Sequence, residues 1–340
     1  MIPRLDISFP LRRQITFWFG KAYSSQEGEY LLNHARTGIV MALRAALSNG
    51  GRVGVVAYNC HTVANAIVAA GCEPVFVDVT EDLHIDTSYL SSLQMDALIV
   101  TNLFGVRNDI NLIRAAQPNA ILIVDNAHGY GLPAEGDFTV YSINQGKFPS
   151  LGEGGILMVN NSEYLATIDN QYIYLPYYSK CQVVKLYMMM MIKSWMHIPI
   201  VYSLITRHLK SRRVIHYKEN IKMKCMAKGV NHLYTSILPS VPRQIAKQRQ
   251  NAQYIADHLI NKKIATNVWY GDNAFMAIVR CDNPKQLYQY FAQYGIETST
   301  HFAKAIEWAK HFGYVEGMCP MSEILIKELV MIPTYKKLKL

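Results

Sequence analysis

A lysine, a carboxylate and a hydroxyl stand close together in one stretch of this 340-residue sequence. Asp125 follows the apolar run ILIV, Ser142 ends the run FTVYS, and Lys147 follows a short loop. The turn Gly152–Gly155, which reads GEGG, closes the stretch. A lysine amine attacks carbonyl carbons, a carboxylate can hold a proton on a ring nitrogen, and a hydroxyl binds phosphate oxygens. The stretch therefore carries the side chains of a candidate site for carbonyl chemistry.

These groups match the needs of pyridoxal phosphate. A lysine forms the Schiff base, an acid keeps the pyridine nitrogen protonated so that the ring withdraws electrons, and hydroxyls with helix-terminal amides hold the phosphate. The alternative is a surface ion pair or a helix cap, since a single aspartate and a single lysine occur together in many α/β proteins. The spacing alone leaves both interpretations open.

The pattern between residues 36 and 155 indicates how such side chains come together. Short β-rich apolar runs alternate with segments of helical period, which is typical of α/β proteins. The runs are almost continuously apolar, as in parallel strands that helices cover on both faces. Because ligands of open α/β sheets bind at the carboxyl ends of the strands, we expect Asp125 and the loop after Ser142 to meet there.

The sequence predicts two domains, because 340 residues exceed what one compact core usually needs. In the first part we expect strands at 52–58, 73–79, 96–105, 120–127, 138–143 and 152–159, and helices at 37–47, 62–71 and near 109–116. In a smaller C-terminal α+β domain we expect helices at 242–259, 284–295 and near 322–330, and a strand at 274–280. The predicted domains are 1–215, with an apolar and basic insert at about 181–215, and 216–340.

Five stretches of the sequence form an ordered set of motifs. They are Ala35–Leu43, Val56–Ile67, Asp125–His128, Ser142–Gly155, and the C-terminal pair Cys319–Glu323 and Val330–Tyr335. The set resembles the motifs of the DegT/DnrJ/EryC1/StrS aminotransferases, the sugar aminotransferases of the type I pyridoxal phosphate fold. In that family D-A-A-[HQ] is similar to the stretch at Asp125, and S-F-H-x-x-K-x-x-x-x-G-E-G-G is similar to the stretch at Ser142. The resemblance covers most of the chain and predicts a mostly parallel central sheet covered by helices.

The resemblance implies a role for individual residues. Lys147 would be the Schiff-base lysine and proton shuttle, and Asp125 the partner of the pyridine nitrogen. Phosphate contacts are implied for Thr37, Gly38 and Ser142, and a place beside the ring for His128.

Other positions depart from the family pattern. The position that covers the cofactor ring falls on Cys60 or His61, and Asn144, a further cofactor-binding candidate, stands where histidine is common. The family forms dimers in which a neighbour's asparagine reaches the phosphate. Asn220, in the stretch NIKM, resembles that asparagine.

The implied function is a homodimeric, pyridoxal phosphate-dependent aminotransferase. It would move an amino group from an amino acid, with glutamate the expected donor, to a nucleotide-linked keto sugar in surface polysaccharide or deoxyamino sugar biosynthesis. Dehydratases of the same family replace the lysine with histidine, so Lys147 argues against that activity. The alternative is a non-catalytic or regulatory member of the fold that binds a sugar or a membrane glycan assembly.

The positive charge of the chain, +9 in total, is concentrated in one segment. Residues 180–249 contain 14 lysines and arginines and one acidic residue, Glu219, whereas residues 1–150 contain 10 basic and 13 acidic residues. This distribution favours a local anionic partner over a nucleic acid. Residues 181–218, apolar and then basic, could contact an anionic membrane surface, pack as an insert or dimer interface, or bind the pyrophosphate of a nucleotide sugar.

The remaining features concern location and metals. The uncharged runs within 181–209 are shorter than the roughly 20 apolar residues of a membrane-spanning helix. The start of the sequence lacks the apolar core of a signal peptide, so we expect a cytoplasmic protein. The alternative is a cytoplasmic protein that associates with a membrane. The cysteines and histidines show no metal-ligand spacing, and we predict no metal site.

Overall fold

The computed structural model describes residues 1–3, 5–208 and 220–340. The predicted domain boundary at 215/216 lies outside the described residues, as do residues 209–215 of the predicted insert and 209–218 of the apolar and basic segment. The division into 1–215 and 216–340 stays a prediction.

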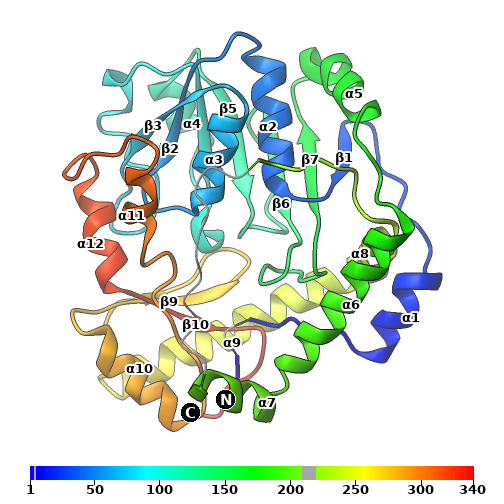
Figure 1. Cartoon of the computed structure of the whole chain (residues 1–340). Coiled ribbons are helices and arrows are strands. Elements are labelled where there is room, and N and C mark those ends of the chain that lie inside the picture. Colours follow the sequence, from blue (N-terminus) through cyan, green and yellow to red (C-terminus); the bar gives the residue numbers. More distant parts are fainter. Residues whose placement is uncertain (4, 209–219) are drawn as a thin grey trace.

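A seven-stranded sheet forms the centre of the molecule (Figure 1). Its strands are β1 (Glu29–Leu32), β2 (Arg52–Val56), β3 (Glu73–Val77), β4 (Ala97–Thr101), β5 (Ile121–Asn126), β6 (Phe138–Ser142) and β7 (Gly155–Val159), in the order β1-β7-β6-β5-β4-β2-β3. The strands from β6 to β3 are parallel, and β7 runs antiparallel between β6 and β1. The predicted α/β fold with a mostly parallel sheet is confirmed, and each of the six strands expected here is present.

Both faces of this sheet are buried. Leu98 and Val100 of β4 belong to one cluster of buried apolar side chains, and Ala97 and Ile99 belong to another. This alternation explains the continuously apolar runs, because successive side chains of a strand point to opposite faces. The surrounding helices are α2 (Ala35–Ala46), α3 (His61–Ala69), α4 (Ile110–Ala116), α5 (Leu165–Ile173) and α8 (Lys228–Ile237).

A second, three-stranded sheet lies in the C-terminal part of the chain. It consists of β8 (Val268–Trp269), β9 (Met276–Arg280) and β10 (Leu329–Pro333), all antiparallel in the order β10-β9-β8. The helices of this part are α9 (Val241–Asn261), α10 (Pro284–Gln293), α11 (Ala305–Lys310) and α12 (Pro320–Glu328). The helix expected near 322–330 is wrong at its end, because Leu329 and Val330 pair with β9 as the fully buried start of β10.

The apolar stretch after residue 180 forms two helices. They are α6 (Lys180–Met196) and α7 (Pro199–His208), and α1 (Leu11–Phe19) lies beside α6 (Figure 1). Pro199 begins α7, where its missing N–H costs nothing, and the chain turns between the two helices. Among the described residues, no helix combines the length and the apolar character needed to cross a bilayer.

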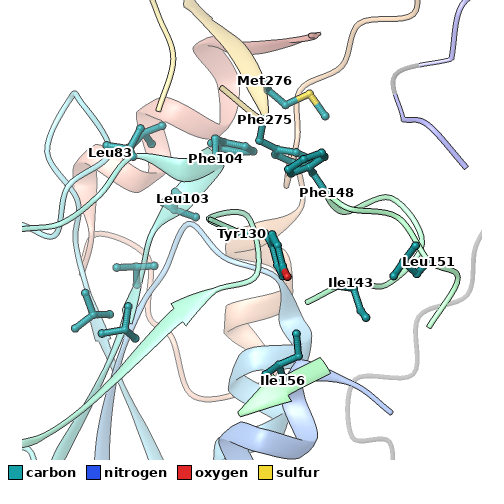
Figure 2. Packing of buried hydrophobic residues seen from close by; sticks show 14 of the residues in the cluster. Leu83, Leu103, Phe104, Tyr130, Ile143, Phe148, Leu151, Ile156, Phe275 and Met276 are labelled. Atoms are coloured by element: carbon teal, nitrogen blue, oxygen red, sulfur yellow. The ribbon is translucent and has the colours of Figure 1, made fainter. Parts of the chain in front are cut away.

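Aromatic side chains from several elements gather around the loop that carries Lys147. Figure 2 shows Phe104, Tyr130, Phe148 and Phe275 within one buried cluster. Phe104 follows β4 and Tyr130 follows β5. Phe148 lies in the loop between β6 and β7, and Phe275 directly precedes β9. The two parts of the molecule therefore meet at the predicted site.

Candidate active site

A cavity of about 220 Å³ lies at the carboxyl ends of β4, β5 and β6. Six predicted site residues line it: Cys60, Asp125, His128, Ser142, Asn144 and Lys147. Four do not line it: Thr37, Gly38, His61 and Asn220. The cavity lies where the parallel strand ends of an α/β sheet place a ligand.

Lys147 and His128 meet inside this cavity. The Nζ atom of Lys147 lies 2.6 Å from Nε2 of His128. The backbone N–H of Phe104 donates to Nδ1 of His128 at 3.3 Å. We therefore assign the proton of a neutral imidazole to Nε2, so that His128 donates to an unprotonated Lys147 amine.

The environment supports this assignment. Burial lowers the pKa of Lys147, although the charges of Cys60 and Asp125 act in the opposite direction. Burial, followed by the charge of Lys147, lowers the pKa of His128 well below its usual range. Phe104, Phe275 and Phe302 stack near the imidazole, with ring centroids 5.0 to 5.7 Å away, and these apolar rings stabilise an imidazolium less than water would. Burial thus favours the neutral form of both groups, and a neutral amine is the nucleophilic form of lysine.

Asp125 is the buried acid of the cavity. Its side chain is 3% exposed, and its Oδ1 accepts a hydrogen bond from the Ala127 N–H at 2.9 Å. Burial raises the pKa of Asp125, whereas the Ala127 N–H and the charge of Lys147 act to lower it. A buried carboxylate in such a place requires a cationic partner, and a protonated ring nitrogen is one.

The first turn of α2 forms the opposite wall, through His34, Ala35 and Arg36. The start of β7 passes close to this turn, and position 155 must be glycine. A Cβ at Gly155 would lie 2.2 Å from the carbonyl carbon of His34. Only glycine lets β7 pass this close to the start of α2. Asn144 reinforces the junction, since its Oδ1 accepts from the Gly154 N–H at 2.9 Å and lies 3.2 Å from His34 Nδ1.

Thr37 and Gly38 lie deeper in α2 than expected for phosphate ligands. The Thr37 hydroxyl is fully buried and donates to Asn33 Oδ1 at 2.8 Å. A Cβ at Gly38 would meet Val140 and Leu157 of the sheet. The parts of α2 that line the cavity are thus its first residues, whose free backbone N–H groups and helix dipole suit a phosphate.

Cys60 and His61, the two candidates for the ring-covering position, have different surroundings. Cys60 lines the cavity, whereas the His61 ring packs on Trp308 at 5.1 Å. Burial alone would raise the pKa of the Cys60 thiol, but hydrogen bonds to His61 and Thr62 and the charge of Lys147 bring that pKa to about 7. The aromatic ring in the cavity wall is Phe302, which the sequence reasoning missed.

Two further cavities adjoin this one. A larger, more open cavity of about 720 Å³ shares His34 and Arg36 with it and is also lined by Asn220, Lys222 and Lys224. On its other side Lys147 lines a cavity of about 240 Å³, which also contains Arg13 and Lys247. Arg36 is a missed candidate as well, although its place at the first turn of a helix after a short strand was a usable signal.

These residues fit pyridoxal phosphate. The cavity brings a lysine amine, a buried carboxylate, the Ser142 hydroxyl and a helix N-terminus to one place. Each of these corresponds to one functional group of that cofactor. Within the described ranges, the histidines, cysteines and carboxylates form no group of three or more that could hold a metal ion.

Known proteins resemble this chain over nearly its whole length. The model of the DegT/DnrJ/EryC1/StrS aminotransferase family matches residues 31–340. A curated relative, the pleiotropic regulatory protein of Geobacillus stearothermophilus, is 21% identical, and the match covers 94% of this chain and 82% of that protein.

Solved structures share the fold. The sugar aminotransferase CalS13 from Micromonospora echinospora has a TM-score of 0.72 at 16% identity, covering 98% of this chain and 95% of that one. Spr1654 from Streptococcus pneumoniae, a sugar aminotransferase described in its PMP form, has a TM-score of 0.71 at 16% identity, covering 100% and 95%. The dehydratase ColD has a TM-score of 0.67 at 17% identity, covering 96% and 87%. The predicted fold of the pyridoxal phosphate sugar aminotransferases is therefore confirmed.

Proposed function

The chain belongs to the DegT/DnrJ/EryC1/StrS aminotransferase family, and we propose that it transfers an amino group from an amino acid, with glutamate as donor, to a nucleotide-linked keto sugar. The observation that carries the proposal is the buried Lys147 amine, 2.6 Å from His128 and in the same cavity as Asp125. CalS13 and DesI, a structure described with its TDP-sugar product, support the sugar substrate through their likeness to this chain. The product would serve the synthesis of a surface polysaccharide or a deoxyamino sugar.

The proposal gives each residue of the cavity a task. When bound, pyridoxal phosphate withdraws electrons from the carbon that carries the amino group. Asp125 holds a proton on the ring nitrogen, and His128 orients the Lys147 amine. Lys147 Nζ takes the proton from the α-carbon of the donor and later gives it back. Ser142 and the first N–H groups of α2 bind the phosphate.

The surroundings of Lys147 suit the two substrates. Arg13 and Lys247, on the far side of Lys147, provide cations for the carboxylates of an amino-acid donor. Lys185, Lys222 and Lys224 in the large open cavity provide them for the phosphates of a nucleotide sugar. The proposal further includes a homodimer, in which Asn220 reaches the phosphate in the partner's cavity, and a cytoplasmic location.

A direct experiment is an absorbance titration of the purified chain with pyridoxal phosphate. The expected result is a visible absorbance band in the wild-type protein that glutamate bleaches and a keto sugar nucleotide restores. Lys147→Ala removes the band, while Lys262→Ala, which changes an exposed lysine at the end of α9, keeps it. A wild-type chain that binds cofactor without bleaching with any amino acid would contradict the proposal.

A second function is favoured by one finding, the likeness to a protein named as a pleiotropic regulator. In that case the chain would keep the fold to bind a sugar or a membrane glycan assembly, without catalysis. A colourless protein that binds no pyridoxal phosphate and still binds nucleotide sugars would support it. Lys147 favours the transaminase, because a regulator needs no lysine amine in its cavity.

A further inference from the structure

Helix α1 exposes a stripe of large apolar side chains. Leu11, Ile15 and Phe19 are 69%, 54% and 83% exposed. They are spaced four residues apart and therefore lie on one face of the helix. The opposite face is buried, with Phe17 1% exposed and packed over Gly229 of α8.

Helix α6 exposes a similar stripe. Val184, Met188, Ile192 and Trp195 are exposed, and Trp195 is 64% exposed. Their spacing of three and four residues again places them on one face. Leu186 and Met190 of the same helix are buried in the core.

The two stripes lie on helices that contact each other. Tyr187 of α6 lies at the contact between the helices, with its ring 5.4 Å from Phe17 and 5.2 Å from Trp18, and its hydroxyl donates to Gln14 at 3.3 Å. On each helix, the face on one side of this contact packs into the core, and the face on the other side is exposed. Helix α1 lies beside α6 (Figure 1), so the two stripes are carried by neighbouring helices. We call the seven exposed side chains of the two stripes the apolar face.

The two chain segments that carry this face have only basic charged residues. Residues 7–26 and 170–208 contain seven lysines and arginines and no aspartate or glutamate. Arg12 stands three residues before Ile15, and Lys185 stands three residues before Met188, so each stripe has an exposed cation at its border. Large apolar side chains bordered by cations are typical of helices that lie in the surface of an anionic membrane.

We propose that the apolar face docks on an anionic lipid bilayer, with α1 and α6 lying in the plane of the interface. The sequence pattern indicated such a contact through 181–218 alone, and the structure adds α1. A second copy of the chain is the less suitable occupant. A two-fold contact would place this face against itself and bring like charges together. A bilayer with negative head groups complements both the apolar side chains and the cations.

The test is sedimentation of the full-length, cofactor-loaded protein with vesicles. Vesicles of phosphatidylcholine and phosphatidylglycerol in equal parts should bind the protein, and vesicles of phosphatidylcholine alone should not. Binding should weaken as the salt concentration rises, because the Debye length falls from about 10 Å at 0.1 M to about 3 Å at 1 M. Arg12→Gln with Lys185→Gln should weaken binding about 25-fold, since each cation near the surface contributes about fivefold.

The double variant Phe19→Ser, Ile192→Ser tests the apolar part. Both side chains are exposed, so the fold and the aminotransferase activity in solution should be unchanged while vesicle binding is lost. Leu112→Ser on α4 is the matched control, because Leu112 is also exposed but lies elsewhere. This variant should bind vesicles like the wild type.

Two results would overturn the proposal. One is that equal amounts of protein sediment with vesicles that contain phosphatidylglycerol and with vesicles that lack it. The other is a smaller particle for Phe19→Ser, Ile192→Ser than for the wild type in light scattering, which would assign the face to a second copy. Neither result depends on whether the chain is a transaminase.

Discussion

Lys147 illustrates how a few contacts set the chemical state of one side chain. A lysine in water is protonated at neutral pH, whereas here burial favours the neutral amine. His128 could oppose this by accepting a proton from Lys147, but its Nδ1 is already occupied by the Phe104 N–H. The imidazole must then donate from Nε2, and only a neutral amine accepts. The reactive form of Lys147 thus depends on a backbone N–H in the loop after β4.

The charge of Asp125 should matter for turnover and less for binding of the cofactor. Asp125→Asn keeps the shape of the side chain but removes the negative charge that holds a proton on the ring nitrogen. We expect turnover to fall by about 100-fold or more. Cofactor binding, followed by absorbance, should survive. Asp109→Asn is the control. Position 109 caps α4 at a distance from the cavity, and aspartate and asparagine both serve as caps. Unchanged turnover in Asp125→Asn would refute the assigned role.

His34 and Glu153 form a second pair of groups that are shifted in opposite directions. Nε2 of His34 and Oε1 of Glu153 lie 3.8 Å apart at the border of the cofactor cavity. Burial, followed by the charge of Arg36, lowers the pKa of His34 to about 4. Burial raises the pKa of Glu153 to about 7, against the charges of Arg36, Lys224 and Lys193. At pH 5 to 6.5 both side chains are therefore mostly uncharged in the folded protein. His34 is deprotonated, and Glu153 is protonated.

This pair predicts a pH dependence that appears only in single variants. As the pH falls from 6.5 to 4, the unfolded chain protonates His34 and the folded chain does not, so the free energy of unfolding decreases. As the pH falls from 7 to 4.5, the folded chain keeps more protons on Glu153, so the free energy of unfolding increases. In the wild type the two effects oppose each other. Glu153→Gln leaves the first, and His34→Asn leaves the second.

Urea denaturation at a series of pH values measures both effects. The free energy of unfolding of Glu153→Gln should decrease on acidification below pH 6.5, and that of His34→Asn should increase below pH 7. Each change should be on the order of 2 kcal/mol. Profiles parallel to that of the wild type in both variants would show that the two groups do not titrate as a pair.

The start of α12 is held by an acid from a distant part of the chain. Asp78, directly after β3, accepts hydrogen bonds from the backbone N–H groups of Met321 and Ser322 at 2.8 Å and from the Ser322 hydroxyl at 2.7 Å. Asp78→Ala leaves these buried donors without an acceptor and should destabilise the protein by on the order of 3 kcal/mol. Asp109→Ala, which removes a surface cap of α4, should cost about 1 kcal/mol. Equal effects in thermal or urea unfolding would argue against a special role of Asp78.

The elements predicted from sequence are those with local signals. The strands of the parallel sheet are continuously apolar, and α9 has a long helical period, so both were found. Helix α1 has neither a side-chain cap nor an acidic first turn, and β1 has only four residues, so neither gave a clear signal. The strand expected at 96–105 ends at Thr101, because the chain turns into the loop of Phe104.

The chemical groups of the site could be predicted from the sequence, but some of the side chains that line its cavity could not. Lys147, Asp125 and Ser142 stand at strand ends or in the loop after one, and their residue types point to one cofactor. Phe302 reaches the cavity only because the C-terminal part packs on the strand ends and stacks this ring on His128. No local pattern around Phe302 encodes that contact. Thr37 and Gly38 do not line the cavity for a similar reason, since the packing of α2 on the sheet decides which turn faces it.

The molecule as a whole presents its cofactor cavity and a basic cavity side by side. The two share His34 and Arg36, and the second contains Asn220. Asn220 does not line the cofactor cavity of its own chain. This arrangement supports the proposed homodimer, in which each chain completes the other's site.

Complementation between two inactive variants tests this arrangement. Lys147→Ala and Asn220→Ala are co-expressed with different tags, and the mixed dimers are isolated by both tags. If Asn220 acts in the partner's cavity, one site of the mixed dimer contains both substitutions and the other contains neither, so about half of the wild-type activity should return. The matched control pairs Lys147→Ala with Asp125→Asn. Both residues line the cavity of the same chain, so each site of that dimer keeps one defect and the dimer should stay inactive. An inactive mixed dimer of Lys147→Ala and Asn220→Ala, or the absence of any mixed dimer, would contradict the shared site.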